Sequence, residues 1–346
     1  MKPAGKEHVA VIVTTIAAPN RNLEALARGC RENDYQFIVV GDEASPPDFH
    51  LEGCRFYALK EQYETGFKLA PLCSTRHYAR KNLGYLIAIR DGATLILETD
   101  DDNIPYEEFW HERRRRQRVP TIANGGWVNI YRYFSDDHIW PRGFPLEHLK
   151  NPFPAFESLP TRDIDCPIQQ GLSNEDPDVD AIYRLTSQLP QSFRTDRRVA
   201  VTAGSWCPFN SQNTAWWRAA FPLLYLPAYC SFRMTDIWRS FAAQRIAWTN
   251  EWGILFHDPT AGQQRNEHNL LRDFEDEVPG YLHNAAICEA LAKLSLPPGI
   301  DGINDNLRTC YEELVKMGVI ATRELDLLEA WICDLNEIQK SFVRSS

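Results

Sequence analysis

Three short runs of apolar, mostly β-branched residues recur in the first hundred positions, at residues 9–13, 37–40 and 95–97. Segments with helical character separate them, at residues 22–33 and 80–92. Strands that are buried on both faces read as nearly continuous apolar runs, and their alternation with helices is typical of a parallel sheet covered on both sides. We therefore predict an α/β fold in which helices flank a mostly parallel sheet.

Polar residues follow each of these runs. They are Thr14, Thr15 and Ile16 after the first run, Gly41 and Asp42 after the second, and Asp100, Asp101 and Asp102 after the third. In open α/β sheets, ligands bind beyond the carboxyl ends of the strands. We expect all of these side chains to meet at one rim of the sheet.

The three consecutive aspartates are the strongest chemical signal in the chain. Neighbouring carboxylates make each other harder to ionise, so a positive partner is expected. In an extended chain Asp100 and Asp102 point to similar sides and Asp101 points away. Carboxylate oxygens suit Mg²⁺ or Mn²⁺, which keep open positions for phosphate oxygens. The alternative is a solvated acidic turn ending at Asn103.

Basic residues surround the start of the helix that precedes the aspartates. Arg76, Arg80 and Lys81 lie there, where helix N-terminal N–H groups also favour anions. A bound cation and a basic helix entrance at one rim together predict a diphosphate ligand, such as a nucleotide-sugar. The first two strand ends would then face the base and ribose, with Asp42 as an acceptor. A solvated helix start and a turn aspartate are the alternatives.

The rest of the chain is less regular. Residues 104–200 are expected to be rich in loops, with a strand near 125–134. Further segments are predicted as strands at 199–206, 223–227 and 252–258 and as helices at 236–248, 306–317 and 324–342. We divide the chain into residues 1–280, with a nucleotide-binding half at 1–103 and a sugar and acceptor half at 104–280, and a helical extension at 281–346. That extension is expected to pack on the domain or to mediate self-association.

Composition narrows the function classes. The net charge of -10 over 346 residues argues against nucleic-acid binding, and the basic run at 111–118 is read as a solvated helix face paired with nearby glutamates. The longest apolar runs are too short for a membrane span, so we expect neither a leader nor a membrane anchor. Nine scattered cysteines without a CxxC motif favour a reduced, cytoplasmic protein.

Several separated motifs together resemble the STELLO family of glycosyltransferase-like proteins and, more distantly, the reversibly glycosylated polypeptides, which act as UDP-arabinopyranose mutases. The similarity spans residues 8–285. It is carried by VTTI, VVGD, RKNLGYLIAIRDGATLILETDDDN, PDVDAIYRLT, PFNSQNTAWW, LPAYCSFRMTDIWRSFAAQRIAW and RNEHNLLRDFEDE.

The resemblance implies a GT-A-like, Rossmann-like nucleotide-sugar-binding fold with a helical C-terminal addition. It places the DxD metal motif at Asp100, Asp101 and Asp102, with Asp102 the first choice for direct coordination. A late histidine often completes such a metal shell, and His257 is the first candidate and His268 the second. Eukaryotic STELLO proteins look membrane-anchored, whereas this chain begins close to its first strand.

The resemblance also implies residues at the sugar. Asp178 and Asp180 lie in the shared PDVDAIYRLT motif and are candidates for the sugar site, although an acidic structural turn is the alternative. The mutases are glycosylated on an arginine in a loop after the metal motif, and Arg142 is a loose match. Trp206 is a candidate for stacking on a sugar, with a place in the core as the alternative.

These observations predict a metal-dependent glycosyltransferase that uses a nucleotide-sugar, with a UDP-sugar expected, and an acceptor that the residues do not name. Inversion would require a carboxylate base, for which Asp236 is the candidate, although a helix N-cap fits its position equally. Retention would require no such base. The alternatives are a UDP-sugar mutase, a non-catalytic scaffold with the same fold, and a metal-dependent phosphodiesterase.

Overall fold

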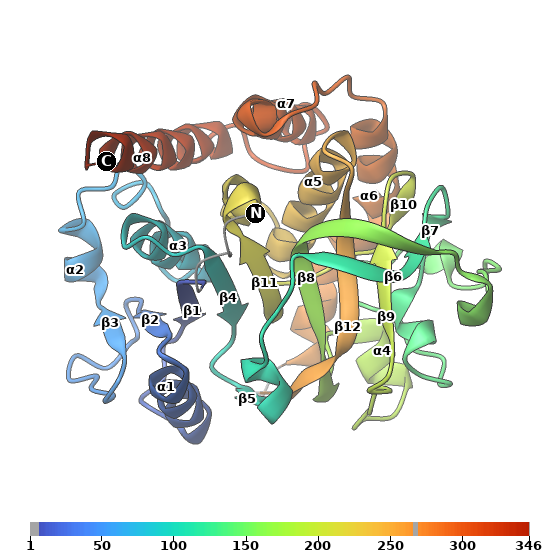
Figure 1. Ribbon diagram of the computed structural model, residues 1–346, viewed down its shortest axis with the longest axis horizontal. Coiled ribbons are helices and arrows are strands. Elements are labelled where there is room, and N and C mark those ends of the chain that lie inside the picture. Colours follow the sequence, from blue (N-terminus) through green and yellow to red (C-terminus); the bar gives the residue numbers. More distant parts are fainter. Residues whose placement is uncertain (1–6, 266–268, 346) are drawn as a thin grey trace.

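The computed structural model describes residues 7–265 and 269–345 as an α/β protein built around one large sheet (Figure 1). The first part of the sheet is parallel and contains four strands in the order β3-β2-β1-β4. The elements of this part are β1 (Val9–Thr14), α1 (Arg21–Asn33), β2 (Gln36–Val40), β3 (Arg55–Tyr57), α2 (Leu59–Tyr63), α3 (Lys81–Arg90) and β4 (Leu95–Thr99).

Strand β1 shows why the apolar runs are continuous. Val9, Val11 and Val13 pack into the core on the α1 side of the sheet, whereas Ala10 and Ile12 pack into the core on the α3 side. Successive side chains of a strand point to opposite faces, so a strand covered on both faces needs apolar residues at every position. The predicted α/β arrangement is confirmed for this half of the molecule.

Helix α3 lies unusually close to the sheet. A Cβ atom at Gly84 would lie 2.7 Å from Ile12 Cγ2 and 2.8 Å from Val40 Cγ2. Only a residue without a side chain allows this approach. The close contact brings the N-terminal end of α3 next to the carboxyl ends of β1 and β2.

The second part of the sheet is mixed rather than parallel. Its elements are β5 (Asn103–Pro105), β6 (Arg116–Ile122), β8 (Thr161–Glu175), α4 (Ala181–Thr186), β9 (Arg198–Val201), β11 (Asn213–Trp217), α5 (Thr235–Thr249) and β12 (Trp252–Gln263), with a separate small pair formed by β7 (Gly126–Trp127) and β10 (Ser205–Trp206). Strand β11 pairs antiparallel with both β4 and β8. The expected mostly parallel sheet is therefore wholly parallel from β3 to β4 and mixed beyond, where β8 pairs parallel with β12 and β6 pairs parallel with β9.

Two local expectations are wrong in this half, and the strand expected near residues 125–134 is present only as the short β7. Residues 125–134 form a two-residue strand followed by a 3₁₀ turn, and residues 218–224 form a 3₁₀ segment that contains Pro222. The basic run at 111–118 leads into β6 instead of forming a helix, and Arg115 pairs with Asp165 of β8 at 2.5 Å. These partners come from distant strands, which local spacing does not reveal.

The C-terminal helices pack on the domain. They are α6 (Leu270–Ala292), α7 (Ile303–Lys316) and α8 (Glu324–Ser345). Leu314, Trp331 and Ile332 join the same core as the α3 face of β1. The predicted boundary at residue 281 falls inside α6.

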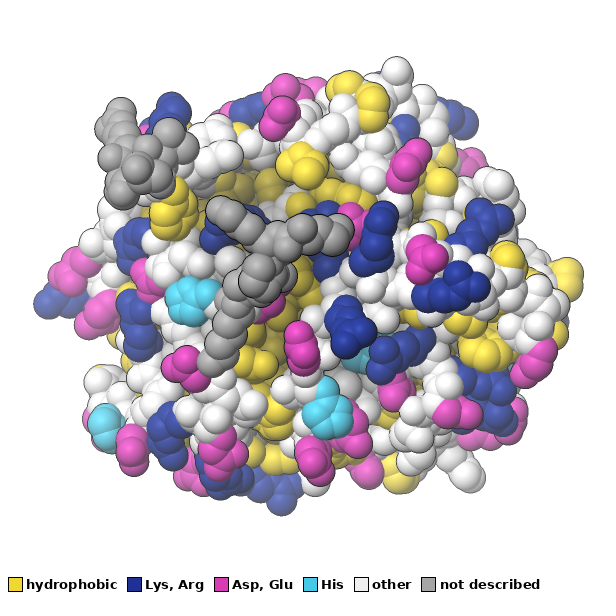
Figure 2. All heavy atoms as spheres, in the orientation of Figure 1, with side chains coloured by type: hydrophobic (Ala, Val, Ile, Leu, Met, Phe, Trp, Pro, Cys, Tyr) yellow, Lys and Arg dark blue, Asp and Glu magenta, His cyan; other side chains and the backbone are white. Residues whose placement is uncertain are grey.

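On the face drawn in Figure 2, acidic and basic side chains are interspersed rather than gathered into one basic patch. Among the helices in the described ranges, none combines the length and the apolar character that a bilayer crossing requires.

Candidate functional site

A cavity of about 820 Å³ lies where the parallel strands end. Its walls come from the residues after β1, β2 and β4, from the segment before α3, and from the start of α5 and the end of β12. Of the predicted nucleotide-binding residues, those lining the cavity are Thr14, Thr15, Ile16, Asp42, Arg76 and Asp101. The sheet thus brings together side chains that are far apart in sequence, at the rim where ligands bind in such folds.

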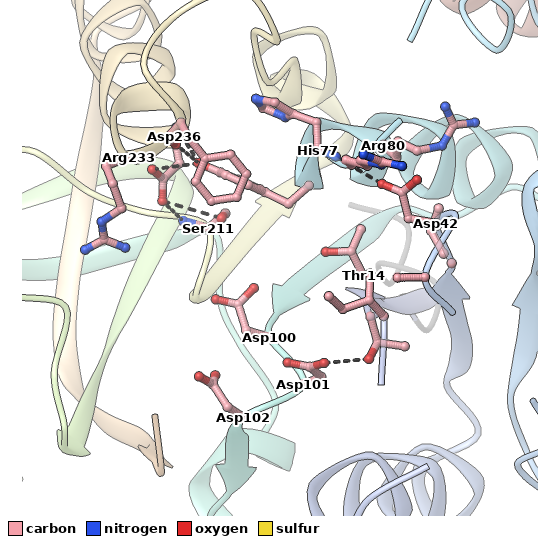
Figure 3. A pocket seen from close by; sticks show the side chains of 18 of the residues that line it. Thr14, Asp42, His77, Arg80, Asp100, Asp101, Asp102, Ser211, Arg233 and Asp236 are labelled. Carbon is pink, nitrogen blue, oxygen red and sulfur yellow. Dashed lines mark hydrogen bonds between the residues drawn. The ribbon is translucent and has the colours of Figure 1, made fainter. Parts of the chain in front are cut away.

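The three aspartates follow one another at the strand end (Figure 3), and each has a different hydrogen-bond partner. Lys81 Nζ donates a hydrogen bond of 2.7 Å to Asp100 Oδ1, and Thr15 Oγ1 donates one of 2.5 Å to Asp101 Oδ2. Gln263 Nε2 donates one of 3.0 Å to Asp102 Oδ2. In this view Asp100 and Asp102 turn to one side while Asp101 reaches toward β1.

Burial works against the charge on two of these carboxyl groups. Burial raises the pKa of Asp100. The Lys81 ammonium lowers that pKa, and the Asp101 charge raises it further. Burial also raises the pKa of Asp101, and the hydrogen bond from Thr15 opposes that shift. A nearby cation would favour the ionised form of both groups.

The donor set of the aspartates fits a hard divalent cation bound together with a ligand. No group of three or more His, Cys, Asp or Glu side chains in residues 7–265 and 269–345 is arranged to enclose a metal ion. Mg²⁺ is usually held by one or two carboxylates, by water and by phosphate oxygens rather than by a complete protein cage. Asp100 and Asp102 could supply the protein oxygens of such a site.

The basic residues before α3 have distinct environments. Lys81 is fully buried behind Asp100, where it also donates to Thr99 O at 3.0 Å. Arg76 is exposed and pairs with Glu43 at 2.7 Å. Lys81 therefore fixes the position of Asp100, whereas the pair between Arg76 and Glu43 is exposed to solvent.

Arg80 is buried at the cavity wall, and its hydrogen-bond acceptors among the described residues are neutral. Its Nε donates to Gln62 Oε1 and its Nη1 donates to Cys73 O, both at 2.7 Å. Its Nη2 is buried and has no hydrogen-bond partner within the described ranges. An unsatisfied buried donor costs about 1–3 kcal/mol, and more when it is charged, so this arrangement is typical of a binding residue.

His77 lies beside Arg80 in the same wall. Its Nδ1 accepts a hydrogen bond from Ala79 N at 3.0 Å, so the proton of the neutral ring is on Nε2. Burial lowers the pKa of His77 to about 4, which keeps the ring neutral at pH 7. Its Nε2 is buried and has no partner among the residues that the structure describes.

The opposite wall is organised by Arg142, which is buried and pairs with two carboxylates. Its Nε and Nη2 contact Asp178 at 2.7 and 2.8 Å, and its Nη2 also contacts Asp236 at 2.9 Å. Asp236 further accepts a hydrogen bond from Tyr78 at 3.2 Å. Arg142 and Asp236, two of the predicted residues, line the cavity, and Asp178 holds Arg142 from behind.

The basicity of Asp236 is lower than a general base requires. Burial disfavours its charge, but the Arg142 guanidinium outweighs burial and holds the pKa of Asp236 well below its usual range. A base works best with a pKa near the operating pH. The geometry therefore favours a role for Asp236 in positioning Arg142 and Tyr78.

Besides Lys81 and Asp178, three further predicted residues do not line the cavity. His257 in β12 is buried, and its Nδ1 donates to Asp258 O at 3.0 Å. Asp180 caps α4 through Tyr183 N, as the structural alternative predicts, and Trp206 packs against Trp248 in the core. His268 lies outside the described residues.

The cavity also contains residues that the sequence-based selection of site residues did not include. They are His77, Tyr78, Ser211, Phe232, Arg233, Gln263 and Arg265. Most of them lie inside the motifs that carry the family resemblance, which was the available signal. Gln263 was missed because β12 continues to that residue rather than ending near Asp258.

Comparison with known proteins identifies similar chains. A family model described as STELLO glycosyltransferases matches residues 233–344. Two proteins of Arabidopsis thaliana are each 29% identical: Probable glycosyltransferase STELLO2 over 289 residues and Probable glycosyltransferase STELLO1 over 282 residues. These matches cover 77% and 72% of this chain but 37% and 35% of the two relatives. The chain thus spans little more than a third of their length.

One solved structure also aligns with this fold. It is a crystal structure of a mycobacterial protein, with 10% sequence identity and a TM-score of 0.41. The alignment covers 81% of this chain and 76% of that one.

Proposed function

This chain belongs to the STELLO family of glycosyltransferases, and we propose that it transfers a sugar from a UDP-sugar donor in a reaction that depends on Mn²⁺ or Mg²⁺. The observation that carries the proposal is the cavity at the ends of β1, β2 and β4, with consecutive aspartates at one end and buried N–H donors at the other. The order β3-β2-β1-β4 of the parallel strands supports a GT-A-like assignment.

The donor would lie along the rim of the sheet. Thr14, Thr15 and Asp42 would contact the nucleoside, and Asp100 and Asp102 would hold the cation against the diphosphate. A bound cation supplies positive charge that neutralises the phosphate oxygens and stabilises the departing diphosphate. The Lys81 ammonium keeps Asp100 in place and limits the repulsion between the neighbouring carboxylates.

The wall around Arg142 would face the sugar and the acceptor. Arg142 and Asp236 are buried and hydrogen-bonded, so they form a rigid surface rather than flexible side chains. We propose that Asp236 orients Arg142 and the Tyr78 hydroxyl toward the transferred sugar. The engagement of Arg142 by two carboxylates disfavours its glycosylation, which the mutase alternative would require.

Metal-dependent nucleotide binding tests this proposal. UDP should bind measurably in calorimetry with Mn²⁺ and at least tenfold more weakly with EDTA, because the cation offsets the charges of phosphate and aspartate. Asp102→Asn should remove the dependence on Mn²⁺ without unfolding the protein. Asp163→Asn, which changes an exposed carboxylate in β8, is the matched control and should behave like the wild type.

Incubation with UDP-sugars then separates transfer from the alternatives. A transferase should release UDP in the presence of Mn²⁺, whereas a mutase should interconvert ring forms and leave the nucleotide-sugar bond intact. A protein that binds UDP equally well with Mn²⁺ and with EDTA would contradict the proposed cation site. Binding without turnover of any UDP-sugar would favour a scaffold.

A further inference from the structure

Arginine side chains from three separate segments line the wall of the cavity around Asp236. They are Arg142, Arg233 and Arg265. Each of them is paired with a carboxylate that does not line the cavity, and these partners are Asp178, Glu277 and Asp273. The cavity is thus lined by the positive member of each pair and not by the negative one, so this wall presents positive charge to a ligand.

Arg233 has donors left for such a ligand. Its Nε and Nη2 both donate to Glu277 Oε1, at 3.1 and 2.9 Å. Its Nη1 has no hydrogen-bond partner among residues 7–265 and 269–345, and 14% of its side chain is exposed. Because Glu277 is fully buried, it holds the guanidinium in one position while the remaining N–H groups are available to an acceptor.

The positive charges at this wall also repel one another. Burial lowers the pKa of Arg265, and the charges of Arg184 and Arg233 lower it further, while Asp273 raises it. An anion that approached these arginines would reduce the repulsion. The wall is therefore better suited to a charged group of a ligand than to a neutral one.

The other side chains of this wall are compatible with a charged sugar. The Asp236 carboxylate accepts from Arg142 Nη2 at 2.9 Å and from Ser211 N at 3.2 Å, so its charge is already compensated. Phe232 lines the cavity next to Arg233 in the chain and is 44% exposed. Its ring offers an apolar surface on which the C–H groups of a sugar ring can pack. A sugar ring that carries an anionic group fits both features.

The place of Arg233 relative to the aspartates indicates which part of a nucleotide-sugar reaches it. Figure 3 shows Arg233 and Asp236 on one side of Asp100. Thr14 and Asp42 lie on the other side of Asp100. The proposed function places the nucleoside at Thr14 and Asp42 and the diphosphate at the aspartates. The part of the ligand that follows the diphosphate is the sugar, and the acceptor must lie next to it.

We infer that this wall binds a saccharide that carries a carboxylate, which deepens the proposed function and rests on it. Arg233 donates to the carboxylate through the N–H groups that Glu277 does not use, and Arg265 adds a second positive charge. Phe232 packs against the sugar ring. The carboxylate can belong to the transferred sugar or to the acceptor, because the same side chains recognise it in either case.

Pairs of ligands that differ only in the carboxylate test this inference on the unmodified protein. If the transferred sugar carries the charge, UDP-glucuronic acid with Mn²⁺ should bind at least about tenfold more tightly than UDP-glucose, because charge-assisted hydrogen bonds are the stronger ones. UDP-galacturonic acid and UDP-galactose provide the same comparison for the other configuration at C4.

A second pair tests the acceptor. If the acceptor carries the charge, methyl glucuronide should bind at least about tenfold more tightly than methyl glucoside to protein that is saturated with UDP and Mn²⁺. Calorimetry or ligand-observed NMR measures these affinities. Preferences below about threefold in every pair would overturn the inference, because a guanidinium that receives the carboxylate must favour the charged ligand.

Substitution of Arg233 provides an independent test. Arg233→Gln should reduce the preference for the charged ligand to less than about threefold and leave the affinity for UDP unchanged, because the aspartates and the nucleoside contacts remain. Glu277 keeps two other donors in this variant, Ala181 N at 2.7 Å and the Tyr281 hydroxyl at 2.6 Å.

Arg184→Gln is the matched control. The Arg184 side chain is 4% exposed, pairs with Asp176 and does not line the cavity. Its charge acts on Arg265 as that of Arg233 does. The control variant should keep the preference of the wild type, because it loses a nearby positive charge but no donor that faces the ligand.

The outcomes separate this inference from the proposed function. An unchanged preference in a folded Arg233→Gln would overturn the inference. Equal losses of affinity for UDP and for the UDP-uronic acid would assign Arg233 to the diphosphate and would also overturn it, while the transferase proposal would stand. If the wild type binds no UDP with Mn²⁺, the proposed function fails and the inference fails with it. If Arg233→Gln does not fold, the ligand pairs decide.

Discussion

The pKa values of the buried residues His257 and Asp236 are set by the residues around them. His257 is 9% exposed, and burial together with the charges of Arg113 and Arg198 lowers its pKa to about 3. The surroundings of His257 favour its neutral form, whereas Arg142 favours the ionised form of Asp236. Neither protonation state follows from residue type, and both bear on catalysis or on stability.

The low pKa of His257 predicts a pH-dependent loss of stability. Above pH 6.5 the ring is neutral in both the folded and the unfolded chain, so its contribution is constant. As the pH falls from 6.5 toward 3, the unfolded chain binds the proton more readily, and the folded state loses stability. Between pH 7 and 4 the free energy of unfolding should fall by roughly 3 kcal/mol more in the wild type than in His257→Gln.

Urea denaturation at pH 7 and pH 4 measures this difference. The comparison with His257→Gln cancels the contributions of the carboxylates, which are the same in both proteins. Parallel stability profiles for the two proteins would show that His257 is not held neutral by its surroundings. A profile that falls more steeply in His257→Gln would contradict the sign of the shift.

At the scale of elements, helix α1 connects the fold to the aspartates. Asn20 caps the helix, because its Oδ1 accepts from Asn22 N and Leu23 N at 3.0 and 2.9 Å. Its Nδ2 also donates to the backbone oxygen of Asp101 at 3.0 Å. One side chain thus satisfies the helix end and fixes the turn that presents Asp101.

Removal of this cap should affect both stability and binding. Asn20→Ala should lower the free energy of unfolding by about 1 kcal/mol, because the first N–H groups of α1 lose an acceptor. It should also weaken Mn²⁺-dependent UDP binding several-fold, because the turn at Asp101 loses its support. Chemical denaturation and calorimetry measure the two effects.

Helix α6 offers a matched control for the cap. Asn269 accepts from Leu271 N and Arg272 N in the same way. Asn269→Ala should therefore cost similar stability without an equal loss of UDP affinity. Equal losses of affinity in both variants would indicate a general effect of destabilisation rather than a role for the turn at Asp101.

On the scale of the whole molecule, a buried ion pair joins the two parts of the sheet. Glu98 of β4 is fully buried and accepts two hydrogen bonds of 2.9 Å from Arg239 of α5. It also accepts one of 2.8 Å from Trp216 Nε1 in β11. The carboxylate lies just before the aspartates, so it anchors their strand to α5 and β11.

Neutralising this carboxylate should be strongly destabilising. Glu98→Gln leaves the Arg239 charge buried without a counter-ion, and loss of one partner of a buried pair costs about 3–5 kcal/mol. Guanidinium chloride denaturation should show this decrease. Asp163→Asn, which disrupts the exposed pair with Arg118, should change stability by less than about 1 kcal/mol. Similar effects in the two variants would contradict the joining role of Glu98.

The sequence alone located one wall of the cavity, which is formed by the aspartates and by the residues after β1 and β2. Buried parallel strands have a continuous apolar pattern, and topology places their carboxyl ends at one rim. Thr14, Asp42 and Asp101 could therefore be assigned to that rim from their positions after the strands. Asp236 was predicted as a candidate base and Arg142 as a loose match to the mutase arginine, and the structure places both on the opposite wall.

Only the tertiary structure decided how these side chains are used. The pair between Arg142 and Asp236 joins residues 94 positions apart, and the Arg80 Nη2 donor became buried without a hydrogen-bond partner among the described residues only when α3 packed against the sheet. The tertiary structure also placed Trp206 in the core and His257 away from the cavity. Local spacing determines strands and their ends, whereas burial, charge pairing and unsatisfied donors arise from contacts between distant segments.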